Sequence, residues 1–279
     1  MRNMLIADGG STKTEWAMGD MRMQTQGINP FHQDDDAIRT ILRDELLPLM
    51  GGRKPKAITF YGSGVRPELA EKMARLLGEV FPEVDNGLIQ AHSDLLGAAR
   101  ALCGHQRGIA CILGTGANSC LYDGQHIVRN TPPMGYILGD EGSGAVLGAH
   151  FLNALYKKRL PASLQAAFED AMQLSLADVI DRVYRQPLAN RWLASLSVFI
   201  RQHLGEPGVQ RLVVDNFLDF IDRNIDPYGC RELPVSAVGS IAYYFQQQLS
   251  EAALERGYAV GRILRSPIDG LVDAERPSL

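Results

Sequence analysis

The stretch LIADGGSTKTEWAM, residues 5–18, decides the fold. Its first three residues are apolar and predict a short buried strand, which Asp8 ends and two glycines turn. Residues 14–18 predict a second strand that runs back, so the polar residues between them form the tip of a hairpin. That tip carries a carboxylate for a cation, together with N–H groups, hydroxyls and an ammonium for phosphate oxygens. Taken alone, the stretch fits a plain hairpin with a polar tip slightly better than a phosphate site.

The residues around Lys13 argue against two common nucleotide-binding loops. A Walker A loop needs a glycine directly before its lysine and a helix after it, but Thr12 precedes Lys13 and a strand is expected next. A dinucleotide-binding fingerprint also needs a helix at this place. Both nucleotide-binding folds are therefore disfavoured.

Length, composition and charge limit the class of protein. The chain has 279 residues, enough for a large core and two domains. Its hydrophobic fraction of 46% and charged fraction of 22% are typical of a soluble globular protein. The net charge of −4 indicates neither a nucleic-acid partner nor a basic membrane face, and no apolar run reaches the roughly 18 residues of a spanning helix. The first strand begins almost at once and leaves no room for a signal peptide, so we expect a cytoplasmic protein.

The four cysteines and six histidines do not show the spacing of metal ligands. No cysteine pair has C-x-x-C spacing, and no histidines form an H-x-H or H-E-x-x-H pattern. We expect buried thiols, and histidines with surface or packing roles.

The opening pattern returns near the middle of the chain. The first hundred residues predict strands at 22–26, 57–61 and 87–92 and helices at 35–49, 67–80 and 94–102. An apolar strand at 109–113 then runs into GTGANS, residues 114–119, and strands follow at 120–122 and 126–129. Because the two copies share little identity, the repeat is one of architecture. The second half predicts helices from GDEGSG to about residue 158 and at 164–173, 176–185, 191–204, 208–224 and 241–256, with strands at 234–238 and 258–264.

Two turns rich in glycine and hydroxyl groups could hold one polyphosphate. A tight hairpin alone would explain GTG, but its pairing with DGGSTK favours phosphate binding. Asp8 is the expected ligand of Mg²⁺, which prefers few carboxylates and several waters. A third motif, Gly239-Ser240 between a strand and a helix, permits close approach of a nucleotide or simply caps the helix. The expected ATP-binding residues are Gly10, Ser11, Thr12, Lys13, Gly114, Thr115, Gly116, Gly239 and Ser240.

Three polar residues have both a catalytic and a structural interpretation. Asp94 follows an apolar strand and could be a general base for phosphoryl transfer to an alcohol, but Ser93 or Asp94 could equally be a helix N-cap. Asp140 also lies near a helix start, where an acidic residue complements the dipole. Asn29 could bond a sugar hydroxyl or make an Asx turn.

The ordered motifs together resemble a known family. DGGSTKT, GINPFH, SDLLGAA, GTGANS, GYILGDEGSG, VGS and SPIDGL are similar, in this order, to those of the N-acetylglucosamine kinase family, most of all its short bacterial members. That family belongs to the sugar kinase, actin and heat-shock chaperone superfamily. The resemblance covers nearly the whole chain.

The resemblance implies an α/β fold, specifically a duplicated ribonuclease-H-like (actin-like ATPase) fold, with two lobes and ATP in a central cleft. The N-terminal lobe would comprise residues 1–105 and a returning C-terminal segment, 266–279. The second lobe would comprise residues 106–265, with helical insertions. We therefore expect an ATP-dependent, Mg²⁺-using kinase that phosphorylates the 6-hydroxyl of N-acetylglucosamine, and the family suggests a homodimer.

The resemblance also implies roles for individual residues. Asp8 and Thr12 match the first phosphate loop, Thr115 and Gly116 the second, and Gly239 with Ser240 the adenosine motif. Asp94 matches the base, which decides between its two interpretations. The sugar-contacting positions are matched by Asn29, Asp94, Ala117, Asn118, Gly135 and Asp140.

Departures and alternatives remain open. The tail VDAERPSL lacks the Tyr-His of related short members, which bears on how the C-terminal helix docks, and the hairpin GDMRMQ is shortened. A glucosamine or N-acetylmuramic acid kinase would share the phosphate motifs. An activator-type ATPase would need cluster-binding cysteines, and the four present lack suitable loop placement. A sugar-sensing regulator would need an added DNA-binding segment, which we do not expect before Leu5.

Overall fold

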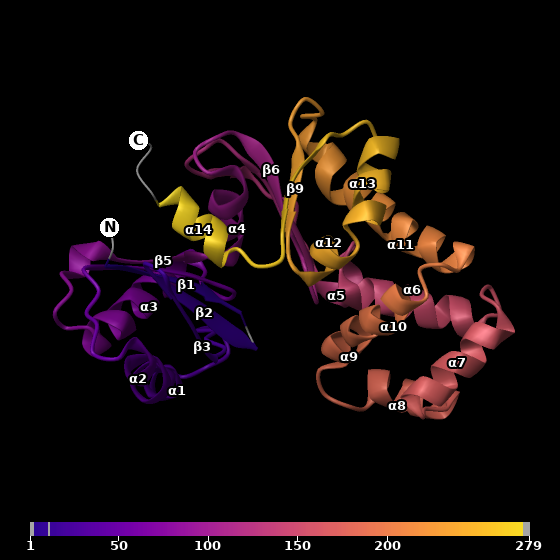
Figure 1. Ribbon diagram of the computed structural model, residues 1–279, viewed down its shortest axis with the longest axis horizontal. Coiled ribbons are helices and arrows are strands. Elements are labelled where there is room, and N and C mark those ends of the chain that lie inside the picture. The colour runs from indigo at the N-terminus through magenta and orange to yellow at the C-terminus, as the bar shows by residue number, and fades with distance from the viewer. Residues whose placement is uncertain (1–2, 11, 276–279) are drawn as a thin grey trace. The chain divides into compact units, whose positions relative to one another are not determined.

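The computed structural model describes residues 3–10 and 12–275. They form two compact units, whose elements are labelled in Figure 1. Unit 1 contains the chain up to Gln106, residues 124–126 and the segment from Ser266 onward. Unit 2 contains residues 107–123 and 127–265. Among the described residues, no helix combines the length and apolar character needed to cross a bilayer.

Unit 1 is built on a five-stranded sheet of mixed direction. Its strands are β1 (Met4–Gly9), β2 (Lys13–Met18), β3 (Met21–Gln26), β4 (Ala57–Gly62) and β5 (Ile89–Ser93). They lie in the order β3-β2-β1-β4-β5. The β1–β2 and β2–β3 pairs are antiparallel, whereas β1–β4 and β4–β5 are parallel. The hairpin expected from residues 5–18 is therefore present, and a strand, not a helix, follows the glycine turn.

The three parallel strands of unit 1 end in register. Gly9 is paired with Gly62, and Gly62 with Ser93. The residues that follow each strand therefore leave the sheet at a common edge. This edge carries the polar tip of the first hairpin and the start of the helix at Asp94.

Helices cover both faces of this sheet. On one face lie α1 (Asp35–Thr40), α2 (Leu47–Met50) and α3 (Pro67–Val80), and on the other lie α4 (Asp94–Cys103) and α14 (Ile268–Ala274), as Figure 1 shows. The core of the unit includes Trp16 and Phe60, whose ring centroids are 5.9 Å apart. Ile268 and Leu271 of α14 are buried, so this helix belongs to the packing of unit 1 despite its distance along the chain.

The expected helix 35–49 is interrupted by a π-helical turn, Ile41–Leu46. There the N–H of Leu47 donates to the carbonyl of Leu42, five residues back. Pro48 follows directly and has no N–H to continue the regular α-helical ladder. The apolar spacing could not show this change, because it marks the buried face of either helix type.

Unit 2 repeats the sheet of unit 1. Its strands are β6 (Gly108–Leu113), β7 (Ala117–Tyr122), β8 (Ile127–Arg129), β9 (Val235–Val238) and β10 (Val260–Leu264), in the order β10-β9-β6-β7-β8. Again the first three strands in the chain pair antiparallel and the last two pair parallel. This is the ribonuclease-H-like topology twice, which confirms the expected duplicated fold.

Helices make up most of the rest of unit 2. They are α5 (Gly135–Leu138), α6 (Gly144–Tyr156), α7 (Ala162–Met172), α8 (Leu176–Tyr184), α9 (Ala189–Ser195), α10 (Ser197–Gln202), α11 (Pro207–Phe220), α12 (Ser240–Tyr244) and α13 (Gln246–Glu255). Three rings, Phe151, Phe168 and Phe199, contact one another between α6, α7 and α10. This cluster explains how the helical insertions form one core with the sheet.

Three helix predictions for the second half need correction, and one helix was missed. The expected helix 191–204 is divided at Leu196, and the expected helix 241–256 is divided at Phe245, where φ is −116° and ψ is 30°. The expected helix 208–224 changes to a π-helical turn, Ile221–Ile225, before Pro227. The short helix α5 was not expected at all. Its N-cap, Met134, has a φ of +62°, and a methionine does not predict this left-handed conformation.

Candidate functional site

Two carboxylates far apart in the sequence, those of Asp8 and Asp94, lie at the strand-end edge of unit 1, close enough for the charge of Asp94 to raise the pKa of Asp8. Asp8 is the penultimate residue of β1 and is paired with Glu15 on β2. Burial raises the pKa of Asp8 to about 7, and the negative charges of Glu15 and Asp94 add to this, while Lys13 opposes it. Carboxylates that raise one another's pKa resist joint ionisation, so this place attracts a cation.

Asp94 is not the N-cap of its helix. The hydroxyl of Ser93 accepts a hydrogen bond from the Leu96 N–H at 3.3 Å and caps α4. Asp94 is the first helical residue, and its Oδ1 accepts from the Leu95 N–H at 2.8 Å. Burial raises the pKa of Asp94, against the opposing effect of the backbone N–H groups. A partly buried carboxylate with a raised pKa has the properties of a general base.

The tip of the first hairpin is a closed turn. The Gly10 N–H donates to the Lys13 carbonyl at 2.9 Å, and the Gly27 N–H donates to the Thr12 carbonyl at 3.2 Å. The side chains of Thr12 and Lys13 are exposed. Ser11, which is also among the predicted ATP-binding residues, lies outside the described residues.

Lys13 is held by an acidic partner that the sequence did not single out. Its ammonium forms an ion pair with Glu15, whose second oxygen accepts from the hydroxyl of Ser266. Burial raises the pKa of Glu15, but the hydrogen bonds from Lys13 and Ser266 outweigh burial and keep it below its usual range. Residues from the two ends of the chain thus fix the lysine beside Asp8.

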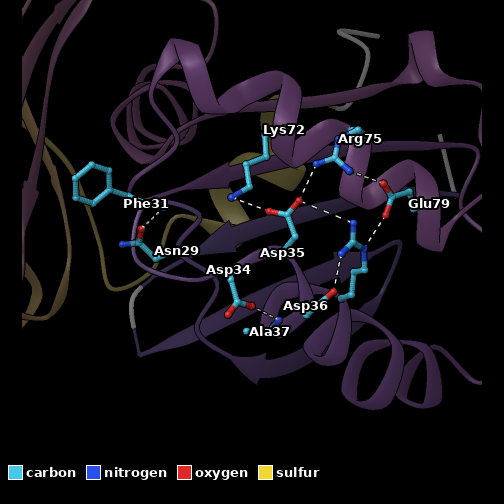
Figure 2. Close-up of polar contacts among 10 residues, drawn as sticks. Asn29, Phe31, Asp34, Asp35, Asp36, Ala37, Lys72, Arg75 and Glu79 are labelled. Atoms are coloured by element: carbon cyan, nitrogen blue, oxygen red, sulfur yellow. Dashed lines mark hydrogen bonds and ion pairs between the residues drawn. The ribbon is translucent and has the colours of Figure 1, made fainter.

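Asn29 lies in a turn after β3 (Figure 2). Its Oδ1 accepts from the Phe31 N–H at 3.0 Å, so the Asx-turn interpretation is correct for this oxygen. Gly64, with φ of +79°, approaches so closely that a Cβ there would lie 2.1 Å from Asn29 Oδ1. The carboxamide is therefore buried and fixed, while its contact with a sugar stays a prediction.

The second glycine turn is joined to the start of α6 in unit 2. The Gly114 N–H donates to the Gly116 carbonyl at 2.9 Å. In return, the Gly144 and Ala145 N–H groups donate to the carbonyls of Gly114 and Thr115 at 2.8 and 3.2 Å. The side chain of Thr115 is exposed. The helix start thus fixes the turn and leaves the threonine hydroxyl accessible.

Asp140 connects the predicted sugar-binding residues of unit 2. Its φ of +54° is in the left-handed region, which is unusual for a residue other than glycine. Burial raises the pKa of Asp140 to about 6. Backbone N–H groups of Ala117 and Gly135 donate to its carboxylate and oppose the shift, while Glu141 adds to it. The structure therefore brings Ala117, Gly135 and Asp140 together, and Gly116 lies against the same carboxylate.

The third motif also lies beside the second turn. Gly239 has a φ of +124°, and a Cβ on it would lie 2.3 Å from the carbonyl oxygen of Leu113. Because Leu113 directly precedes Gly114, the Gly239 backbone packs at the base of the GTG turn. Ser240 begins α12 and is exposed. Only glycine permits this close approach of two backbones.

Asn118 has one end of its side chain engaged. Its Oδ1 accepts from the Ser119 N–H and from the Nδ2 of Asn130, both at 2.9 Å. Sequence reasoning singled out Asn118 but neither Asn130 nor the pair Glu15 and Ser266. Their importance depends on contacts across the fold, for which no local motif exists.

The donor set fits Mg²⁺ only as a largely hydrated ion. Asp8 supplies a carboxylate whose pKa is raised mainly by burial and further by the negative charges of Glu15 and Asp94. Within the described part of the chain, no group of three or more His, Cys, Asp or Glu side chains could hold a metal. One carboxylate with several waters is a coordination that Mg²⁺ accepts when phosphates supply further oxygens.

The chain is similar to several solved structures. The Putative N-acetylglucosamine Kinase of Porphyromonas gingivalis is 47% identical, with a TM-score of 0.93, over 97% of this chain and 98% of that one. The Putative N-acetylglucosamine Kinase of Chromobacterium violaceum is 20% identical, with a TM-score of 0.71, over 99% of each chain. A ROK family transcriptional regulator, a homologue of the E. coli MLC protein, is 10% identical with a TM-score of 0.52 over 98% of this chain and 78% of that one. The latter two likenesses concern the fold alone. No family model matches, and no curated protein matches.

Proposed function

The chain belongs to the N-acetylglucosamine kinase family, and we propose from this that it is an ATP-dependent amino-sugar kinase. The proposed reaction transfers the γ-phosphate of ATP to the 6-hydroxyl of N-acetylglucosamine. The observation that carries the proposal is the state of Asp94. Ser93 caps α4, so the Asp94 carboxylate is not needed as the N-cap. Burial raises the pKa of Asp94, as expected of a general base.

Asp94 is the proposed catalytic residue. Its carboxylate would accept a hydrogen bond from the sugar hydroxyl and orient the oxygen toward phosphorus. As the new O–P bond forms and the bond to the β-phosphate oxygen breaks, the hydroxyl proton passes to Asp94 and ADP leaves. The partly buried position favours the neutral acid that results, because burial disfavours the charged form.

The remaining predicted residues would bind the two substrates. Amides and hydroxyls of both glycine turns, with the Lys13 ammonium, would contact the phosphates, and Gly239 with Ser240 would contact the adenosine. Asp8 would hold Mg²⁺, which offsets phosphate charge when bound. In unit 2, Asp140 and Asn118 would bind sugar hydroxyls, with Ala117 and Gly135 shaping the wall that Asp140 already contacts. In unit 1, Asn29 would do so from its fixed turn.

The decisive experiment is an ADP-release assay with a panel of amino sugars. We expect turnover with N-acetylglucosamine to exceed that with glucosamine and with N-acetylmuramic acid, and ATP consumption without sugar to be slow. Preference for another sugar of the panel would change the named substrate but keep the kinase. Absence of sugar-dependent ADP release with every member would overturn the proposal.

Asp94→Asn tests the base within the same assay. The amide keeps the shape of the side chain but cannot accept the proton, so we expect a loss of about 10²- to 10⁴-fold in kcat with ATP binding retained. Asp20→Asn, a similar change in the exposed turn between β2 and β3, serves as control and should retain normal activity. Turnover near the wild-type rate in Asp94→Asn would exclude the proposed role. The family also suggests a homodimer, and size-exclusion chromatography with light scattering would test this oligomeric state.

A further inference from the structure

The side chain of Asn130, directly after β8, faces three acceptor oxygens. Its Nδ2 lies 2.9 Å from Asn118 Oδ1, 2.6 Å from the Ser119 carbonyl and 3.1 Å from the Thr131 carbonyl. Carbonyl oxygens can only accept, so the NH₂ end of Asn130 must face them. The two backbone carbonyls therefore determine which way round the Asn130 carboxamide lies.

This orientation is passed on to Asn118. Its side chain meets two donors, the Ser119 N–H and the NH₂ of Asn130, so only its oxygen can face them. The opposite end of the same carboxamide, its NH₂ group, is then directed away from both. Turning Asn118 over would place donor against donor on that side and leave the NH₂ of Asn130 without one of its acceptors.

The backbone on both sides of Asn130 is anchored to the π-helical turn Ile221–Ile225 and the residues after it. Thr131 Oγ1 donates to the Asn224 carbonyl at 3.1 Å, and the Thr131 N–H donates to the Tyr228 hydroxyl at 3.1 Å. Before Asn130, the Arg129 guanidinium donates to the carbonyls of Pro227 and Tyr228 at 2.6 and 3.1 Å.

The strand that carries Asn118 is tied to the same place. The Ser119 hydroxyl donates to the Asn224 carbonyl at 3.2 Å and lies 2.7 Å from the Tyr228 hydroxyl. The segments that carry Asn118 and Asn130 are thus both hydrogen-bonded to the same stretch, residues 224–228. Asn130 cannot move away from Asn118 without breaking several of these hydrogen bonds, of which the two at the Ser119 hydroxyl are buried.

We propose that Asn130 is a positioning residue, which holds the Asn118 carboxamide so that Asn118 presents only hydrogen-bond donors to the sugar. The inference rests on the proposed function, in which Asn118 binds the sugar. It goes further by naming the chemistry that Asn118 recognises, an acceptor oxygen such as a hydroxyl lone pair or an acyl carbonyl. Asn130 acts through Asn118 and does not itself touch the substrate.

The test compares Asn130→Asp with a matched control, Thr131→Val. Aspartate has the size of asparagine but no N–H, so it cannot donate to Asn118 and repels its oxygen. We expect the KM for N-acetylglucosamine to rise about five- to tenfold, the worth of roughly one hydrogen bond, with the KM for ATP unchanged. Thr131→Val removes one hydrogen bond of the same segment without touching Asn118, and we expect its sugar KM to stay within about twofold of wild type.

A double-mutant cycle shows whether Asn130 acts through Asn118. Asn118→Ala should itself raise the sugar KM, and Asn130→Asp should then add less than about twofold in that background. If Asn130→Asp keeps its full effect without the Asn118 side chain, or if Thr131→Val has an equal effect, the positioning role is wrong. If Asn118→Ala leaves the sugar KM unchanged, the proposal also fails, because Asn118 then does not recognise the sugar.

A readout independent of catalysis separates this inference from the proposed function. The side-chain NH₂ signals of Asn118 in a ¹⁵N NMR spectrum can be assigned by their loss in Asn118→Ala. We expect them to move in Asn130→Asp and not in Thr131→Val. Unmoved signals in Asn130→Asp would overturn the contact even in an active kinase. Moved signals with no sugar turnover in the wild type would instead place the failure in the proposed function.

Discussion

At the scale of single residues, the candidate site concentrates carboxylates that folding makes harder to ionise. Asp8, Asp94 and Asp140 all have raised pKa values, and burial is the main cause for each. Glu15 is the exception, because Lys13 and Ser266 hydrogen-bond to it. Such residues cost the free protein stability and fit a role toward a ligand.

Asp8→Asn is expected to stabilise the protein. The folded pKa of about 7 lies above the usual 3.8, so the protonated form is preferred in the fold. That contribution is complete below pH 3.8 and is lost as the pH rises through about 7. A neutral amide avoids the loss, so the free energy of unfolding at about pH 8 should rise by up to a few kcal/mol.

Urea titrations with a chelator present would measure this effect. The gain in the free energy of unfolding should shrink toward zero below about pH 4, where Asp8 of the wild type becomes protonated in the folded and in the unfolded protein. Asp20→Asn, in an exposed turn, should show no gain at either pH. A gain from Asp8→Asn that is equally large in acid would show that packing, and not ionisation, is responsible.

Asp140 should make sugar binding depend on pH. Its pKa is about 6, and the ionised form is the one that accepts hydrogen bonds from sugar hydroxyls. As the pH falls through about 6, protonation of Asp140 should raise the KM for N-acetylglucosamine. In Asp140→Asn the sugar KM should be high throughout and flat over this range. A wild-type sugar KM that is constant between about pH 5 and pH 8 would contradict the assignment.

Local sequence could predict which polar residues lie at turns, but not the partners that decide their chemistry. Residue types alone gave a general base and a helix cap similar weight at Asp94, and the 3.3 Å contact from the Leu96 N–H assigns the cap to Ser93. One partner of Glu15 is Ser266, separated from it by almost the whole chain. The roles toward ATP and sugar remain predictions.

At the scale of elements, strands were predictable and helix interruptions were not. The alternation of turn residues and short apolar runs placed the strands of both sheets near their observed positions. The two π-helical turns, Ile41–Leu46 and Ile221–Ile225, escaped because hydrophobic spacing does not distinguish hydrogen-bond ladders. A usable signal was present in both cases, since a proline, Pro48 or Pro227, follows each turn within two residues.

Helices α1 and α3 are joined by a network of ion pairs around Asp35 (Figure 2). Lys72 and Arg75 each lie 2.8 Å from its carboxylate and lower its pKa to about 2. Since the folded pKa lies below the usual 3.8, the network stabilises the fold above that pH. The contribution is lost as the pH falls from about 4 to about 2.

Asp35→Asn should therefore lower the urea midpoint at neutral pH and become neutral in strong acid. The side chains are partly exposed, so the effect should be small and should weaken in high salt. Asp36→Asn is the matched control, because its carboxylate is almost fully exposed and forms an ion pair with Arg39 at 2.8 Å. If both substitutions lowered the urea midpoint equally, the ion pairs between α1 and α3 would not be the cause of the stabilisation.

At the scale of the whole molecule, the two hairpins of the sequence predicted the duplicated fold. Local sequence does not show how α14, far along the chain, packs on unit 1, because this depends on contacts between distant residues. Leu271 of α14 is fully buried in unit 1. Arg22 of β3 also donates to Asp269 of the same helix at 2.8 and 2.9 Å. These contacts form although VDAERPSL departs from the tail of related short members.

Leu271→Ala should destabilise unit 1 selectively. Removing a buried leucine side chain costs about 2–5 kcal/mol, and the cavity lies under α4 and β1. Hydrogen exchange should quicken in β1 and α4, while α11 and α13 of unit 2 keep their protection. Leu254→Ala on the exposed face of α13 is the control and should change neither unit. Faster exchange in unit 2 to the same degree would mean that the two units unfold together.

Unit 1 consists of segments that are separated in the sequence, and this has a consequence for its synthesis on the ribosome. A ribosome that has made the first 106 residues has made every strand of the first sheet, but not the helix that packs over β1 and α4. All residues of unit 2 are made before Ile268–Ala274 emerges. Domains that are continuous in sequence can fold in the order of their translation. Here the unit that is translated first acquires its last helix only after the other is fully made, so a nascent chain carries an unfinished first domain for most of its synthesis.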